Sequence, residues 1–261
     1  MAKTRNLDRR RLLARAASGM GTLLLSGCDR LSESQWWARL LERAEPLTET
    51  VQSAITGTHA MAREFTEADL SPQFKSNGTS EPDDEQYQAL ARTNFADWRL
   101  EVSGLVERPL RLSLADLRAL PSRTQITRHD CVEGWSCIGK WKGARLGALL
   151  DRAGPRPEAR YVMFFCADPM ERTLDGATNR YYESIDIAGA YHPQTILAYE
   201  MNDQVLPIAH GAPLRLRDER QLGYKMAKYI MRIELVRSFA NFGRGHGGYW
   251  EDRGYEWYAG V

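Results

Sequence analysis

The chain has 261 residues, of which 43% are hydrophobic and 26% charged, the composition of a soluble globular protein. Its formal net charge is only +1, which excludes the overall basic field expected of a nucleic-acid-binding protein. Four cysteines are too few for a small domain stapled by disulfides. The length suits one large domain or two small ones.

The basic residues are concentrated at the N-terminus. Residues 1–27 carry a net charge of +5, which leaves −4 for the rest of the chain. Arg9-Arg10-Arg11-Leu12-Leu13 precedes a short apolar stretch, and the stretch ends in Leu25-Ser26-Gly27-Cys28. The first pattern indicates a twin-arginine export signal and the second a lipobox, with lipid attached to Cys28 after cleavage. We therefore expect a protein exported folded to the periplasm and anchored to the inner membrane. The alternative is a basic amphipathic helix that stays on the protein.

The remaining chain divides by composition into three further parts. Residues 28–70 read as a lipid-anchored tether and lead-in, and residues 71–86 as a loop rich in Ser, Pro, Asn, Gly and Asp. Residues 71–240 are predicted to form the main domain. The aromatic tail, residues 241–261, is predicted to pack on that domain, with a docking surface for an electron-transfer partner as the alternative.

Within the main domain, short strands and short helices follow one another in irregular order. Alternation or continuous apolar character predicts strands at residues 98–104, 124–128, 161–167, 195–199 and 228–236. A helix begins after the N-cap Ser113 and ends before Pro121, and a second spans residues 146–153 and ends at Gly154. This mixture favours an α+β domain over a doubly wound sheet.

Chemistry-bearing residues concentrate in the segment from Arg128 to Ser136. Cys131 follows a predicted strand and precedes a glycine-containing turn, so its thiol can point into a cleft as a nucleophile or a soft metal ligand. The cations Arg128 and His129 beside it would favour the thiolate; a buried, inert cysteine is the alternative. The five histidines lack metal-ligand spacing, and the absence of Cys-x-x-Cys-His argues against covalently attached haem.

This segment, Cys131-Val132-Glu133-Gly134-Trp135-Ser136, resembles the molybdenum-ligand region of the sulfite oxidase superfamily. It is most similar to the branch that contains the periplasmic protein-methionine-sulfoxide reductase catalytic subunit. Segments 161–166, 210–215 and 223–228 resemble, in the right order, the strand after the ligand cysteine, the pterin-contact segment and the cofactor loop. The resemblance covers roughly residues 70–240.

The resemblance implies a sulfite-oxidase-type α+β domain with mixed sheets that binds one molybdenum-molybdopterin per chain, with Cys131 as the molybdenum ligand. Arg215, Lys225 and Lys228 would supply charge for the pterin phosphate. The full set of implied cofactor contacts is Asn77, Gly78, Cys166, His210, Arg215, Gly223, Lys225, Met226, Ala227 and Lys228.

Some of these positions depart from the branch or have alternatives. His210 stands where the reductase branch has Asn, and Cys166 where it has Thr, so Cys166 can equally be a core residue. A Cys137–Cys166 disulfide is one option in an oxidising compartment, but the sequence does not give the pairing. The first pterin-contact loop is placed at residues 76–79, with residues 93–95 as the alternative.

The resemblance also implies oxygen-atom transfer, and we expect reduction of an S-oxide or N-oxide. Sulfite oxidation is the first alternative, and an exported binding module that keeps the fold without turnover is the second. With no haem in this chain, electrons would come from a separate partner, a membrane b-type cytochrome or a periplasmic c-type cytochrome.

Overall fold

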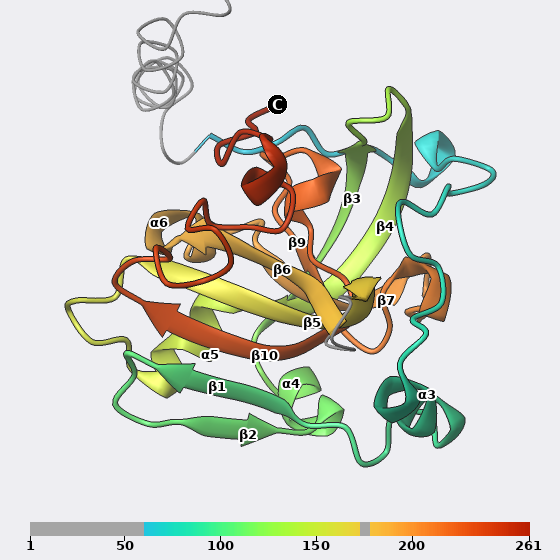
Figure 1. The fold of residues 1–261 in the computed structure, drawn as a ribbon. Helices are drawn as coiled ribbons and strands as arrows, with labels where there is room; N and C mark the ends of the chain where they lie inside the picture. Colours follow the sequence, from blue (N-terminus) through green and yellow to red (C-terminus); the bar gives the residue numbers. More distant parts are fainter. Residues whose placement is uncertain (1–59, 173–177) are drawn as a thin grey trace, which may run out of the picture. The chain divides into compact units, whose positions relative to one another are not determined.

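A computed structural model describes residues 60–172 and 178–261 (Figure 1). The predicted export signal, Cys28 and most of the 28–70 lead-in lie outside the described residues. The strands are β1 Leu100–Gly104, β2 Leu110–Leu112, β3 Ser122–Asp130, β4 Ser136–Arg145, β5 Tyr161–Arg172, β6 Thr178–Asp186, β7 Ile196–Met201, β8 Gln204–Val205, β9 Arg215–Arg217 and β10 Ile230–Val236. The helices are α3 Glu85–Arg92, α4 Leu114–Arg118, α5 Leu146–Ala153 and α6 Ile187–Ala190, with 3-10 turns η1 Glu67–Asp69, η2 Ile208–His210, η3 Gly223–Lys225 and η4 Glu251–Arg253.

Two mixed sheets form the scaffold. The first has the order β2-β1-β10-β5-β6, in which β1 and β10 are parallel and the other neighbours antiparallel. The second has the order β3-β4-β7-β8, with β9 also paired to β7. β3 and β4 form a long hairpin that rises beside the first sheet (Figure 1). The short turn of this hairpin, residues 131–135, carries the cysteine motif.

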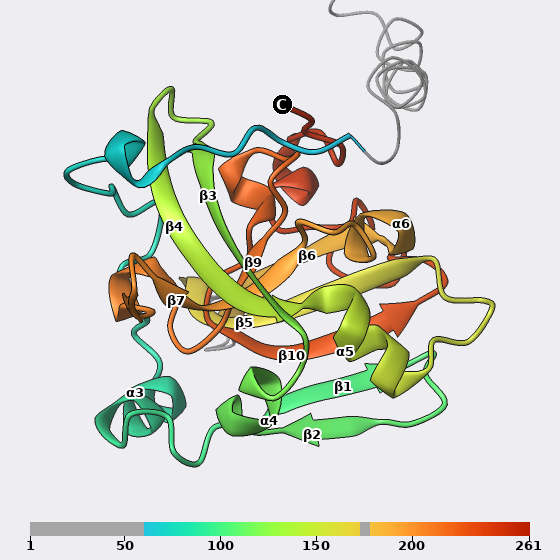
Figure 2. The ribbon, with the colours of Figure 1, turned by 180° about the vertical axis from the view of Figure 1, so that it is seen from behind.

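The main core lies on the first sheet. Leu149 and Leu150 of α5 pack there with buried residues of β1, β5 and β10, and Figure 2 shows α4 and α5 on that side, beside β4. The predicted start of α4 and the predicted end of α5 are confirmed. Ser113 caps α4 by accepting a hydrogen bond from Asp116 N–H, and Gly154 closes α5 in the left-handed conformation at φ 69°.

The α+β class is confirmed, and the predicted strands correspond to β1, β3, β5, β7 and β10. Five strands, β2, β4, β6, β8 and β9, and two helices, α3 and α6, were not predicted. In β4 the buried positions include Gly139 and Gly143, so the strand lacks an apolar alternation. In β6 the buried face carries the polar residue Glu183. Helix α3 begins at Glu85, inside the stretch predicted as loop, because Asp84 accepts from Tyr87 N–H and caps it. In the described ranges, no helix is both long and apolar enough to cross a membrane.

The C-terminal tail contacts the first sheet and η3. Ser184 on β6 donates to Gly247 O at 2.5 Å and accepts from the indole of Trp257 at 2.8 Å. Glu251 forms an ion pair with Lys225 of η3 at 2.5 Å. These contacts hold the tail over the end of β6.

Candidate functional site

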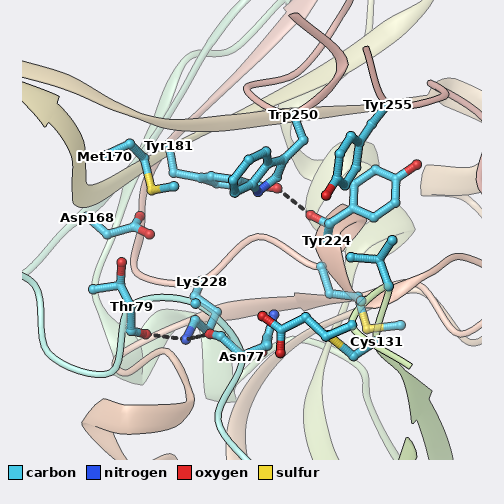
Figure 3. A pocket seen from close by; sticks show the side chains of 15 residues that line it. Asn77, Thr79, Cys131, Asp168, Met170, Tyr181, Tyr224, Lys228, Trp250 and Tyr255 are labelled. Carbon is cyan, nitrogen blue, oxygen red and sulfur yellow. Dashed lines mark hydrogen bonds between the residues drawn. The ribbon is translucent and has the colours of Figure 1, made fainter. Parts of the chain in front are cut away.

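A cleft opens where both sheets, the cofactor-loop segment and the tail meet (Figure 3). Its walls come from the segment before α3, the β3–β4 turn, β5, β6, η3 with the residues that follow it, and the tail. The lining residues are Asn77, Gly78, Thr79, Cys131, Val132, Glu133, Asp168, Met170, Tyr181, Gly223, Tyr224, Met226, Lys228, Trp250 and Tyr255.

Cys131 is held at this cleft by the β3–β4 turn. Its N–H donates to Trp135 O at 2.9 Å, and its carbonyl accepts from Gly134 N–H at 3.0 Å. Gly134 has φ 83°, a left-handed conformation that glycine adopts without strain. The geometry fixes the thiol at the cleft wall and leaves Val132 and Glu133 exposed at the rim.

The prediction that neighbouring cations favour the Cys131 thiolate is wrong for the protein alone. Burial raises the pKa of the Cys131 thiol, against the opposing effect of a hydrogen bond from the Glu133 backbone. Arg128 instead pairs with Asp130 at 2.8 Å, and His129 is fully buried. Burial and the nearby Arg217 hold the pKa of His129 well below its ordinary value, so this imidazole is neutral. A bound metal ion would favour the thiolate here.

Lys228 holds the loop of residues 76–79, the first choice for the first pterin-contact loop, against the cleft. Its ammonium donates to the carbonyls of Asn77, at 2.6 Å, and of Thr79. Tyr229 also donates to Thr79 O, at 2.8 Å. Asn77, Gly78 and Thr79 therefore line the cleft, whereas the alternative segment 93–95 follows α3 and contributes no lining residue.

Three basic side chains lie at the back of the cleft: Arg215 and Lys228, which are buried, and His210, which is half-buried. Arg215 is fully buried; one nitrogen donates to His210 O at 3.0 Å, and its Nε and Nη2 have no partner among the described residues. Burial is the main cause that lowers the pKa of Arg215 to about 9, of Lys228 to about 7 and of His210 to about 4. The charge of Arg215 lowers the pKa of Lys228 and of His210 further, whereas Arg217 lowers that of Arg215. Asp168 opposes the shift of Lys228.

This basic group fits an anionic ligand. Buried donors without partners and cations that repel one another are costly unless a negative group lies among them. The pterin phosphate and dithiolene of the implied cofactor supply such charge. At Gly223 the backbone lies close to His129, because a Cβ at residue 223 would lie 2.4 Å from the His129 ring. Met226 packs near the same ring, with its sulfur 3.3 Å from Nδ1.

Three predicted contacts, Lys225, Cys166 and Ala227, are placed elsewhere; Ala227 is buried in the hydrophobic core and does not line the cleft. The Lys225 ammonium is 1% exposed and lies 2.5 Å from carboxylates of both Glu183 and Glu251, so its charge is neutralised inside the protein and not offered to a phosphate. Cys166 lies on β5 in the hydrophobic core and does not line the cleft. Cys131, Cys137 and Cys166 are all free thiols.

Several lining residues were not predicted. The side chains of Asp168, Met170 and Tyr181 come from the β5–β6 pair, and those of Trp250 and Tyr255 from the tail. Trp250 and Tyr255 are far from Cys131 in sequence, and the aromatic clustering of the tail was the one sequence signal that drew attention to them. Asp168 is buried, and its burial raises the pKa of the carboxyl to about 6.

The chain is similar to known proteins along most of its length. The family model described as the oxidoreductase molybdopterin binding domain matches residues 87–241. A protein from Azospira oryzae, provisionally named protein-methionine-sulfoxide reductase subunit YedZ1, is 37% identical over 97% of this chain and 87% of its own. The protein-methionine-sulfoxide reductase catalytic subunit MsrP of Ralstonia nicotianae is 33% identical over 88% of this chain and 69% of its own.

Among solved structures, the sulfane dehydrogenase SoxCD from Paracoccus pantotrophus aligns with 69% of this chain and 46% of its own. The two share 21% sequence identity at a TM-score of 0.48.

Proposed function

We propose that this chain, an enzyme that belongs to the oxidoreductase molybdopterin-binding domain family, reduces an S-oxide by oxygen-atom transfer. One observation carries the proposal: the Cys131 thiol opens into a cleft that Lys228 lines and that is backed by the buried Arg215, two of whose nitrogens have no hydrogen-bond partner among the described residues. A soft thiolate ligand beside an anion-binding pocket matches what a molybdenum-pterin cofactor requires.

The chain's own residues would have separable tasks when one cofactor is bound per chain. Cys131 would hold the molybdenum through its thiolate. Lys228, Arg215 and His210 would neutralise and hydrogen-bond the pterin, and Asn77 and Gly78 would bring backbone and amide groups to it. The bound cofactor supplies two-electron oxygen-atom-transfer chemistry. The protein's contribution is to orient the cofactor and shape the space for substrate.

The cleft walls favour a thioether oxide over sulfite. Met170, Trp250 and Tyr255 line it together with Val132, whose side chain is 48% exposed. Trp250 and Tyr255 stack with ring centroids 5.3 Å apart. Apolar walls of this kind suit a methyl sulfoxide side chain, whereas a sulfite dianion would face Glu133 and Asp168. The names of the two relatives, which specify protein methionine sulfoxide, support this substrate.

The location and the electron source belong to the same proposal. We infer export by the twin-arginine route and anchoring through a lipid on Cys28, from the Arg9–Leu13 and Leu25–Cys28 patterns. Each turnover consumes two electrons and two protons and releases a sulfide and water. A separate membrane b-type cytochrome or periplasmic c-type cytochrome would supply the electrons.

The Cys131→Ser variant tests the metal assignment. We expect about one molybdenum per chain in protein made with a working cofactor pathway, and loss of most of it, with all turnover, in Cys131→Ser. Elemental analysis and reduction of methionine sulfoxide with a dye donor measure both. Cys137→Ser is the matched control, since Cys137 is a buried free thiol on β4 outside the cleft. Equal molybdenum in wild type and Cys131→Ser would contradict the assignment.

The Cys28→Ala variant tests the anchor. If the lipobox is processed, wild-type protein fractionates with membranes and its maturation is blocked by globomycin. Cys28→Ala should then appear in the soluble periplasmic fraction with its molybdenum retained. Wild-type protein found entirely in the soluble fraction would exclude lipid anchoring while leaving the enzyme assignment intact.

A further inference from the structure

A fully buried cluster of three charged side chains lies beneath the wall of the cleft. Lys225 contacts Glu183 Oε1 and Glu251 Oε1, both at 2.5 Å, and all three side chains are at most 1% exposed. They come from η3, β6 and η4, so the cluster joins the cofactor-loop segment, the first sheet and the tail. Gly248 packs against it so closely that a Cβ would lie 2.0 Å from Glu251 Oε2.

Two carboxylates and one ammonium leave this cluster one negative charge in excess. An uncompensated buried charge is costly, and a carboxyl group in that position binds a proton instead. Burial and the neighbouring Glu251 raise the pKa of Glu183 well above its ordinary value, against the opposing effect of Lys225. The cluster is balanced when Glu251 pairs with Lys225 and Glu183 is neutral.

The hydrogen bonds of Tyr181 indicate which oxygen of Glu183 carries that proton. Tyr181 lines the cleft, and its hydroxyl lies within hydrogen-bond reach of Tyr224 O, the contact drawn in Figure 3, and 3.1 Å from Glu183 Oε2. A phenol has a single proton, and a backbone carbonyl can only accept. When that proton goes to Tyr224 O, the second contact is a hydrogen bond only if Glu183 Oε2 carries a proton and donates it to Tyr181.

We propose that Glu183 stores a proton and that Tyr181 relays it into the cleft for the reduction of the substrate oxide. Glu251 and Lys225 form the balanced pair that keeps Glu183 protonated. The relay rests on the proposed function, because S-oxide reduction consumes two protons as the departing oxygen becomes water.

The transfer balances without a further reagent. The Tyr181 O–H bond breaks as an O–H bond forms on the departing oxygen, and the Glu183 O–H bond breaks as the Tyr181 O–H bond is restored. The second proton comes from solvent through the open cleft, and the electrons come from the donor of the proposed function. Glu183 regains its proton from water between turnovers.

Other charged groups act on the same residues and determine how the test is designed. Burial raises the pKa of Tyr181, and the charges of Glu183 and Glu251 raise it further. Cys166 and Asp168 on β5 add smaller contributions in the same direction. The pKa of Asp168, and that of Asp218 elsewhere in the core, is raised by burial to about 6. At pH 8 both aspartates are ionised, so a carboxylic acid that remains protonated there is distinguishable from them.

Infrared spectroscopy at pH 8 tests the stored proton and needs no turnover. We expect a carbonyl band of a protonated carboxylic acid that shifts in deuterium oxide. Glu183→Gln removes the acid itself, and Glu251→Gln leaves Lys225 to ionise Glu183, so both variants should lose the band. Tyr182→Phe is the control: Tyr182 lies next on the same strand and bonds the tail carboxylate Asp252. A wild-type spectrum without the band overturns the proposal.

Kinetics of molybdenum-loaded protein test the relay. Tyr181→Phe should lower kcat by about 100-fold, the low end of general acid contributions, with KM and molybdenum content unchanged. Its solvent isotope effect should exceed that of the wild type, whereas Tyr182→Phe should retain both kcat and the isotope effect. Unchanged kcat in Tyr181→Phe overturns the relay alone. Wild-type protein that reduces no S-oxide would refute the proposed function, and the infrared band then decides whether Glu183 stores a proton.

Discussion

At the scale of single residues, Arg217 illustrates how this protein handles buried charge. Its guanidinium is fully buried, bonds Glu219 at 2.5 and 2.8 Å, and lies 4.4 Å above the ring of Trp141. It also contacts His129 Nδ1 at 2.9 Å. Arg217 thus satisfies a buried carboxylate and orients the neutral imidazole that packs against Gly223.

Replacing Arg217 by Met should be strongly destabilising. Methionine fills similar volume, but it leaves Glu219 buried and without its cation, so we expect a loss of about 3–5 kcal/mol in the free energy of unfolding. Urea denaturation measures this loss. Lys142→Ala removes a surface ion pair with Glu200 and should cost less than about 1 kcal/mol. Similar losses in the two variants would contradict the assigned role of Arg217.

At the scale of elements, the sequence predicts those strands whose buried positions are apolar. In β1 and β10, apolar residues alternate with polar ones or follow one another. The sequence therefore predicts the bounds of both strands to within a few residues. β4 was missed because glycines occupy buried positions, and a Cβ on Gly143 would lie 2.2 Å from Leu197 O on β7. The backbones of β4 and β7 lie so close together that only glycine fits at residue 143. A search for apolar alternation does not detect a strand in which glycines occupy buried positions.

The same limit applies to the site. The β3–β4 turn and the 76–79 loop could be proposed because their residue types carry the signal locally. Lys225 could not be assigned correctly, because its partners Glu183 and Glu251 lie 42 and 26 residues away. The tail likewise reaches the cleft only through tertiary contacts. Local sequence therefore indicates which side chains can do chemistry, while the charge that surrounds each one depends on the packing of distant elements.

At the scale of the whole molecule, a near-neutral chain concentrates basic side chains behind one cleft. The net charge of +1 conceals this arrangement. Lys228 is buried beside Arg215, and burial lowers its pKa to about 7 in the folded protein against about 10.4 in an unfolded chain. Folding without an anionic ligand therefore expels a proton from Lys228, and stability in this region depends on pH.

The sign of that dependence follows from proton counting. Between pH 7 and 8.5 the unfolded state retains the Lys228 proton and the folded state loses it, so Lys228 makes stability rise with pH and fall as pH drops towards 7. Each proton contributes a slope of at most about 1.4 kcal/mol per pH unit. The proton stored on Glu183 gives a slope of opposite sign, so only a difference between variants isolates Lys228.

We therefore expect the unfolding free energy of cofactor-free Lys228→Met to rise less steeply with pH than that of the cofactor-free wild type. The difference should approach about 1.4 kcal/mol per pH unit between pH 7 and 8.5, the range below the ordinary titration of cysteine and tyrosine. Urea denaturation at several pH values measures both slopes. Lys142→Met, which changes a lysine at the surface, should match the wild type. Parallel slopes for Lys228→Met and wild type would show that Lys228 is not a strained cation awaiting an anion, and would remove the electrostatic argument for the pterin site.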